Sequence, residues 1–320
     1  MKADVAVILC NLGGPSSLDE VEPFLLSLLS DPNVIQLPWL LKPLQKPLAR
    51  LIVKRRLAES KNLYREIGGK SPLVALTRIQ AEALSQKIKL PVYVLMGHSH
   101  PNIRDLITEF KSLDKTPSKV LVLPLFPHYS TSTTKSSFDD IDSVLGEEFS
   151  DLEIIKVTSY PTHPKLVEAW VKRIQASAKH FKGDYELIFS AHSIPARYVQ
   201  KGDPYLGEIQ ACIGEIMHFF PNQKFRLCFQ SKLGPEKWLE PSTMAVLESL
   251  NPGTQVLIVP ISFVSDHVET IHEIGKGFAE IARARNLKMR RTPGLNHDPT
   301  FIDCLASLVS QNLDLNLSKA

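Results

Sequence analysis

The sequence predicts an α/β protein with two similar Rossmann-like lobes, each a parallel sheet flanked by helices. Short apolar runs alternate with longer amphipathic stretches, as expected for strands that are buried on both faces and connected by helices. The apolar runs also fall into two sets of four with matching order and spacing, which indicates an internal duplication.

The eight expected strands are residues 5–14, 92–98, 120–126 and 153–160, then 185–192, 225–231, 256–263 and 287–294. The third run of each set contains a proline, Pro124 or Pro260. The fourth run of each set leads to a proline at the start of an amphipathic pattern, Pro164 or Pro299, which predicts a helix there.

The first half carries extra residues between its first two strands, from Gly13 to Pro91. They include "LPWLLKPLQKPLARLIVKRR" (37–56), which combines apolar bulk with cations. Such a lip suits a flat apolar ligand that carries carboxylates, or a membrane surface. An amphipathic helical hairpin packed on the sheet is the alternative. We expect an N-terminal lobe over 1–158 with this insertion at about 30–75. A C-terminal lobe over 159–295 carries the candidate site, and a C-terminal helix within 296–320 packs back on the first lobe.

Composition excludes several classes of protein. The net charge of +3 is too small to indicate a nucleic-acid partner. No run resembles a signal peptide or reaches the length of a membrane-spanning helix, so we expect a cytoplasmic protein. The four cysteines are far apart in sequence and form no C-x-x-C pair, which predicts free buried thiols.

Candidate catalytic side chains follow the predicted strands of the second half. Ligands of open α/β sheets bind beyond the carboxyl ends of the strands. His192 ends "FSAH", and Glu269 follows the strand that contains "VLIVP". A loop hydrogen bond would also explain a histidine at this position. Asp266 and Glu269 also fit a capping box, in which the glutamate only satisfies a backbone N–H.

A helix that starts near Asp266 would align Asp266, Glu269 and Glu273 on one face. Three like charges in a row destabilise a helix unless a cation or a proton path uses them. We therefore expect this row to handle a divalent metal next to a histidine base. Two or three ligands with an open side suit a metal that is passed on, and ferrous iron, zinc, cobalt and nickel all fit the ligand types.

The sequence resembles the ferrochelatases, enzymes that insert ferrous iron into a porphyrin to make haem. The resemblance runs along nearly the whole chain and is strongest in "FSAHSIP" (189–195) and "VPISFVSDHVETIHEI" (259–274). It also includes "NLGGP" (11–15), "VKRRLAESKNLYREIGGKSPL" (53–73), "PHYSTSTTKSS" (127–137), "GDPY" (202–205) and "FQSKLGPEKWLEPST" (229–243).

The resemblance implies a chelatase-type fold with the active-site cleft between the lobes. His192 and Glu269 become the catalytic pair and the metal-contacting residues, with Asp266, Glu273 and His267 on the metal or proton path. The implied porphyrin-binding residues are Leu12, Arg55, Arg56, Tyr64, Ser71, Tyr129, Ser130 and Phe263. Ferrous iron and a porphyrin are the expected partners, no cofactor is tightly bound, and the late Cys304 alone predicts no iron–sulphur cluster.

One segment departs from the family pattern. The sequence has "MGHSHP" (96–101) where family members often carry an arginine and an aromatic residue. His98 and His100 lie either in a surface loop or in a metal site. Whether protoporphyrin IX or coproporphyrin III is the substrate stays open, as does the oligomeric state. Other functions considered are a cobalt or nickel chelatase of the same fold and a non-catalytic tetrapyrrole-binding protein. A nucleotide-binding oxidoreductase is disfavoured because "NLGGPSS" lacks the G-x-G-x-x-G spacing.

Overall fold

The computed structural model describes residues 4–232, 234 and 236–314. The described chain divides into two compact units. Unit 1 holds the described residues of Met1–Ser159 and Ile302–Ala320, and unit 2 is Tyr160–Phe301. The eight apolar runs predicted as strands are all strands, and the α/β class is confirmed.

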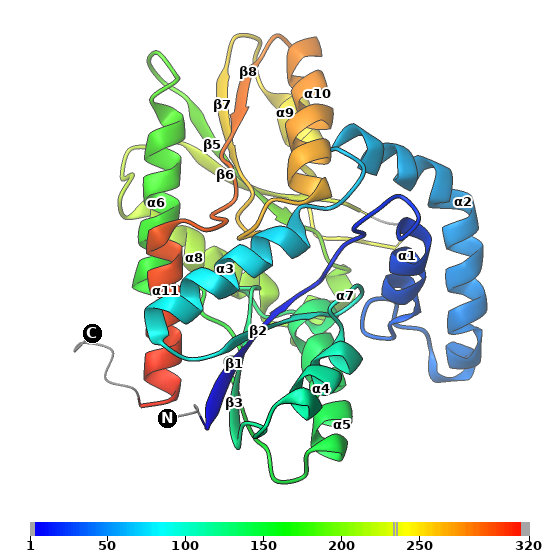
Figure 1. Ribbon diagram of the computed structural model, residues 1–320. Coiled ribbons are helices and arrows are strands. Elements are labelled where there is room, and N and C mark those ends of the chain that lie inside the picture. Colours follow the sequence, from blue (N-terminus) through cyan, green and yellow to red (C-terminus); the bar gives the residue numbers. More distant parts are fainter. Residues whose placement is uncertain (1–3, 233, 235, 315–320) are drawn as a thin grey trace. The chain divides into compact units, whose positions relative to one another are not determined.

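Unit 1 contains a four-stranded parallel sheet in the order β2-β1-β3-β4 (Figure 1). Its strands are β1 (Val5–Asn11), β2 (Val92–Met96), β3 (Lys119–Pro124) and β4 (Glu153–Lys156). Its helices are α1 (Val21–Ser30), η1 (Trp39–Leu44), α2 (Gln45–Glu66), α3 (Leu73–Ile88), α4 (Ile103–Ser112), η2 (Thr131–Lys135) and α5 (Ser136–Glu148), with most of α11 (Pro299–Asn312).

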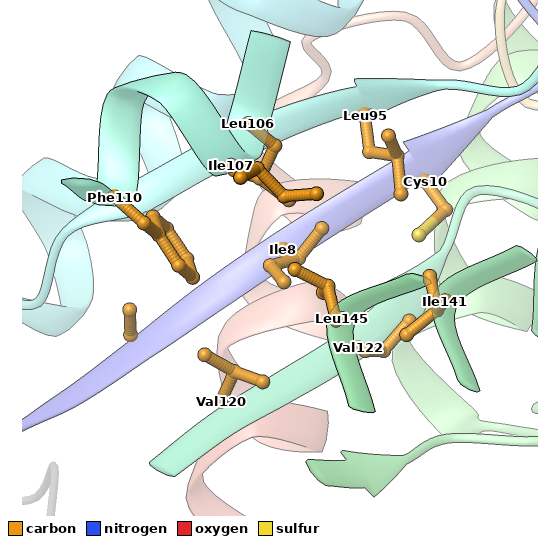
Figure 2. Packing of buried hydrophobic residues seen from close by; sticks show 11 residues of the cluster. Ile8, Cys10, Leu95, Leu106, Ile107, Phe110, Val120, Val122, Ile141 and Leu145 are labelled. Carbon is orange, nitrogen blue, oxygen red and sulfur yellow. The ribbon is translucent and has the colours of Figure 1, made fainter. Parts of the chain in front are cut away.

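The core of unit 1 forms where alternate residues of the strands meet α4 and α5. Ile8 of β1 and Val122 of β3 pack with Phe110 of α4 and Leu145 of α5, and all four are fully buried (Figure 2). Each such aliphatic or aromatic side chain contributes roughly 1.5–3 kcal/mol by leaving water. An Asn102–Asp105 capping box starts α4 and thereby fixes the first turn of a core helix.

Unit 2 contains a second four-stranded parallel sheet in the order β6-β5-β7-β8 (Figure 1). Its strands are β5 (Glu186–His192), β6 (Phe225–Gln230), β7 (Gln255–Val259) and β8 (Lys288–Arg291). Its helices are α6 (Pro164–Ala178), α7 (Ala196–Gln200), α8 (Tyr205–Met217), α9 (Thr243–Ser249), η3 (Glu269–Phe278) and α10 (Ala279–Ala284).

The two sheets share one strand order, displaced by four strands along the chain. In both, the third strand is followed by a loop and a π-helix, η2 after β3 and η3 after β7. The fourth strands lead to α6 and α11, which begin at Pro164 and Pro299 as predicted. The structure therefore confirms the duplication inferred from spacing. All four cysteines are free and buried, as expected.

The extra residues of the first half form α1, η1, α2 and α3. α2 packs against α1. Trp39 and Leu40 of η1 nevertheless expose 77% and 68% of their surface. The apolar residues of η1 are therefore a surface feature, whereas Ala49 and Val53 of α2 are buried. Within the described residues, none of the helices combines the length and hydropathy needed to cross a bilayer.

Candidate active site

His192 is the last residue of β5, at the carboxyl edge of the second sheet. Two contacts fix its backbone: its N–H donates to Ser262 Oγ at 2.9 Å, and its carbonyl oxygen accepts from the Tyr205 hydroxyl at 2.9 Å. The imidazole remains 36% exposed. A fixed backbone with a partly open ring is the arrangement that a reacting histidine needs.

Glu269 begins the π-helix η3, the element that follows β7. Its Oε2 lies 2.9 Å from Nδ1 of His192. The capping-box interpretation is wrong, because the backbone N–H of Asp266 donates to Asn296 Oδ1 while the Glu269 carboxylate faces His192. A π-helix with i→i+5 hydrogen bonds is rare and is found most often at functional sites.

Burial and charge act in opposite directions on this pair. Burial lowers the pKa of His192, but the charge and hydrogen bond of Glu269 raise it by more, so the net pKa lies above the ordinary histidine value. Burial by itself raises the pKa of Glu269, and the neighbouring His192 outweighs it, so the net pKa is lowered. The pair therefore favours a carboxylate that orients an imidazole ready to accept a proton.

Glu273 lies one turn further along η3 and shares a partner with Glu269. The hydroxyl of Ser231 lies 2.8 Å from Oε2 of Glu269 and 2.5 Å from Oε2 of Glu273. Burial and the nearby Glu269 charge raise the pKa of Glu273. The two glutamates thus form one buried acidic unit next to His192.

Asp266 does not belong to that unit, so the expected row of three carboxylates is wrong. Its oxygens accept from Arg291 Nη1 at 2.9 Å, Asn296 Nδ2 at 2.9 Å and Thr270 Oγ1 at 2.9 Å. Burial raises its pKa, but Arg291 and these donors lower it by more. Asp266 therefore anchors the start of η3 to the segment after β8, because a buried carboxylate is stable only with such partners.

His267 and Phe263 lie next to His192 and Glu269. Nε2 of His267 is 3.9 Å from Oε1 of Glu269, and burial lowers the pKa of His267. The His267 ring packs on Phe263 at 4.3 Å between ring centroids, and Phe263 meets His192 edge-on at 6.1 Å. These two side chains make one wall of the site in unit 2.

Gln230 and Ser231, at the end of β6, were missed by the sequence reasoning. Gln230 is buried, and its Nε2 donates to Glu269 Oε2 at 3.4 Å, while its Oε1 accepts from Ser190 at 2.7 Å. The signal was available: β6 is the neighbour of β5 in a parallel sheet, so its carboxyl end lies beside His192.

The expected porphyrin-binding residues of unit 1 divide into two groups. Leu12, Tyr129 and Ser130 follow β1 and β3, and Ser71 joins the loop after β1 through its N–H, which donates to Pro15 O at 2.8 Å. Tyr64 is buried in α2, whereas Arg55 and Arg56 are exposed on the same helix. The structure thus brings Ser71 to the loop that follows β1, beside Gly14 and Pro15.

His98 and His100 point to different partners, which argues against a shared metal site. His98 contacts Ser27 Oγ at 3.1 Å and Asp31 at 3.8 Å, while His100 contacts Asp105 at 2.5 Å. Across the described part of the chain, no group of three or more His, Cys, Asp or Glu side chains is arranged to hold a metal ion.

The chain is similar to known proteins in both sequence and fold. The family model described as ferrochelatase matches residues 4–313. A ferrochelatase of Geotalea uraniireducens is 40% identical over 98% of this chain and 99% of that protein, and one of Aquifex aeolicus is 37% identical over 96% and 99%. Among solved structures, SirB from Bacillus subtilis with Fe3+ has a TM-score of 0.58 at 11% identity, over 98% of this chain and 96% of that chain. CbiX, described as the terminal enzyme for siroheme biosynthesis in denitrifying bacteria, has a TM-score of 0.50 at 11% identity, over 96% and 98%.

Proposed function

The chain belongs to the ferrochelatase family and inserts ferrous iron into a porphyrin in haem synthesis, and we propose that His192 and Glu269 carry this reaction. The observation that carries the assignment is the 2.9 Å contact between Nδ1 of His192 and Oε2 of Glu269, at the carboxyl edge of a parallel sheet. Porphyrin and ferrous iron are substrates, so the iron is cargo and not a resident cofactor.

Metal insertion requires that two pyrrole protons leave the porphyrin. With the Glu269 carboxylate on Nδ1, the imidazole carries its hydrogen there, and Nε2 presents a lone pair. We propose that Nε2 accepts a pyrrole proton or contacts the incoming iron. A positioned general base contributes on the order of 10²- to 10⁴-fold to such a step.

We propose that the metal or proton path continues from the His192–Glu269 pair to Glu273. The common contact of Glu269 and Glu273 with the Ser231 hydroxyl supports this path. His267 is proposed to assist through Oε1 of Glu269, at 3.9 Å. Asp266 is left out, because Arg291, Asn296 and Thr270 already occupy its carboxylate.

The porphyrin is proposed to contact Phe263 in unit 2 and a set of residues in unit 1. The exposed cations Arg55 and Arg56 suit the propionates, since guanidinium groups bind carboxylates through two parallel hydrogen bonds. The remaining proposed contacts are Leu12, Tyr64, Ser71, Tyr129 and Ser130.

Protoporphyrin IX is proposed as the first substrate to test, with coproporphyrin III as the alternative. The exposed apolar residues of η1 favour the less carboxylated of the two ligands.

The exposed apolar residues of η1 also support a proposal of peripheral membrane contact. Trp39, Leu40 and Leu44 are exposed next to the exposed cations Lys42 and Lys46, which matches the interface of an anionic bilayer.

Anaerobic metallation tests the activity. Purified protein is mixed with ferrous iron and, separately, with each porphyrin, and loss of the free-base absorption is followed. Turnover with one porphyrin supports the proposal and identifies the substrate. Binding without turnover would indicate a carrier, and turnover with cobalt or nickel alone would indicate a different chelatase. Cosedimentation with anionic vesicles, compared with neutral ones, tests whether the lip binds membranes. The double variant Trp39→Ser and Leu40→Ser should bind the vesicles more weakly and should keep its turnover on a water-soluble porphyrin.

A further inference from the structure

Ser231, directly after β6, has an unusual backbone conformation. Its φ is +65°, in the left-handed region that L-residues with a Cβ atom disfavour. Glycine adopts this conformation without strain, and asparagine does so more readily than serine. A strained backbone that persists at a candidate active site suggests that the side chain itself is needed.

The side chain of Ser231 contacts the same oxygen that orients His192. Its Oγ lies 2.8 Å from Oε2 of Glu269, and that oxygen is 2.9 Å from Nδ1 of His192. The backbone N–H of Ser231 donates separately to Oε1 of Glu273 at 3.0 Å. A glycine would keep the contact from the backbone N–H and lose both hydroxyl contacts, the one with Oε2 of Glu269 and the one with Oε2 of Glu273 at 2.5 Å. Of these two, the contact with Glu269 is the one that reaches the oxygen facing His192.

The carboxylate of Glu269 has a second possible orientation, toward His267. Its other oxygen, Oε1, lies 3.9 Å from Nε2 of His267, and Gln230 reaches Oε2 only at 3.4 Å. Without the Ser231 hydroxyl, the nearest remaining hydrogen-bond partner of Oε2 would be His192 itself. The carboxylate could then rotate toward His267, which would leave the imidazole of His192 without its orienting partner.

We infer that Ser231 is a positioning residue for metal insertion, and that its hydroxyl holds Oε2 of Glu269 against His192. The inference rests on the proposed roles of His192 and Glu269. It extends them to a residue that acts through Glu269.

Ser231→Gly separates the contribution of the hydroxyl from that of the backbone N–H. It relieves the left-handed strain and keeps the N–H, which offsets the loss of the hydroxyl contacts, so its melting temperature should stay close to that of the wild type. Its kcat should fall about 10-fold or more, because a hydrogen bond to a charged group is lost, while KM for porphyrin stays within about 2-fold. Ser231→Thr should show the reverse pattern: its hydroxyl retains most of kcat, and its branched side chain lowers the melting temperature.

Lys89→Gly is the matched control. Lys89 also has a left-handed backbone, with φ +58°, but it is an exposed C-cap residue of α3 in unit 1. Its substitution should keep or raise the melting temperature and leave kcat unchanged. Wild-type kcat in Ser231→Gly would overturn the inference while the proposed function stands. Absence of turnover in the wild type would overturn both.

Discussion

Nδ1 of His192 and Oε2 of Glu269 lie 2.9 Å apart, although 77 positions separate them in the sequence. The contact joins the end of β5 to the start of η3. It holds an imidazole in one orientation at the carboxyl edge of the sheet. Most expectations for the reaction follow from this geometry.

His192→Ala should remove metal insertion and spare porphyrin binding. The substitution deletes the ring that we propose as the proton acceptor, and we expect kcat to fall on the order of 10²- to 10⁴-fold. The porphyrin Kd, from fluorescence quenching, should change little. Turnover retained in this variant would show that another group is the base.

Glu269→Gln should slow insertion with the fold intact. The amide keeps the size of the side chain but loses the charge that orients His192 and raises its pKa. The melting temperature should stay close to the wild-type value. A large drop in melting temperature with a small change in kcat would instead give Glu269 a mainly structural role.

Asp266→Asn should reduce stability in a pH-dependent way. The pKa of Asp266 is lowered in the folded protein, so its carboxylate stabilises the fold above the unfolded value of about 3.9. That contribution is lost as pH falls through the lower folded pKa. At neutral pH the loss should be about 1.5–3 kcal/mol, the usual value of a hydrogen bond to a charged group.

Thermal melts of the wild type and Asp266→Asn between pH 7 and pH 3 test this. The difference in melting temperature should stay constant down to about pH 5 and shrink below about pH 4. A difference that does not change with pH would show that shape, and not charge, is the contribution of Asp266.

Gly14→Ala should disturb the loop after β1. A Cβ at Gly14 would lie 2.6 Å from both Cβ and Oγ of Ser71, so one segment must shift. Because Leu12 and Ser71 are proposed porphyrin contacts, KM for porphyrin should rise more than kcat falls. Gly146→Ala is the control: it lies in α5 with nothing within 4 Å of the added Cβ, and it should stabilise the helix by up to about 1 kcal/mol.

Sequence reasoning predicted the strands because their signal is local. A run such as "VLIVP" is apolar throughout, short and rich in β-branched residues, which is typical of a strand buried on both faces. The position of His192 followed in the same way, since it ends a strand. Asp266 could not be assigned correctly, because its role depends on Arg291, 25 positions away. Ser231 was missed because its importance lies in a backbone angle and in two contacts that no spacing encodes.

The identical strand order of the two sheets lets each half be compared with the other. Asn11 ends β1 as His192 ends β5, and Thr131 begins η2 as Glu269 begins η3. Neither Asn11 nor Thr131 titrates near neutral pH, so these two positions of the first half cannot form an acid–base pair. The acid–base pair that we propose in unit 2 therefore has no counterpart at these two positions of unit 1.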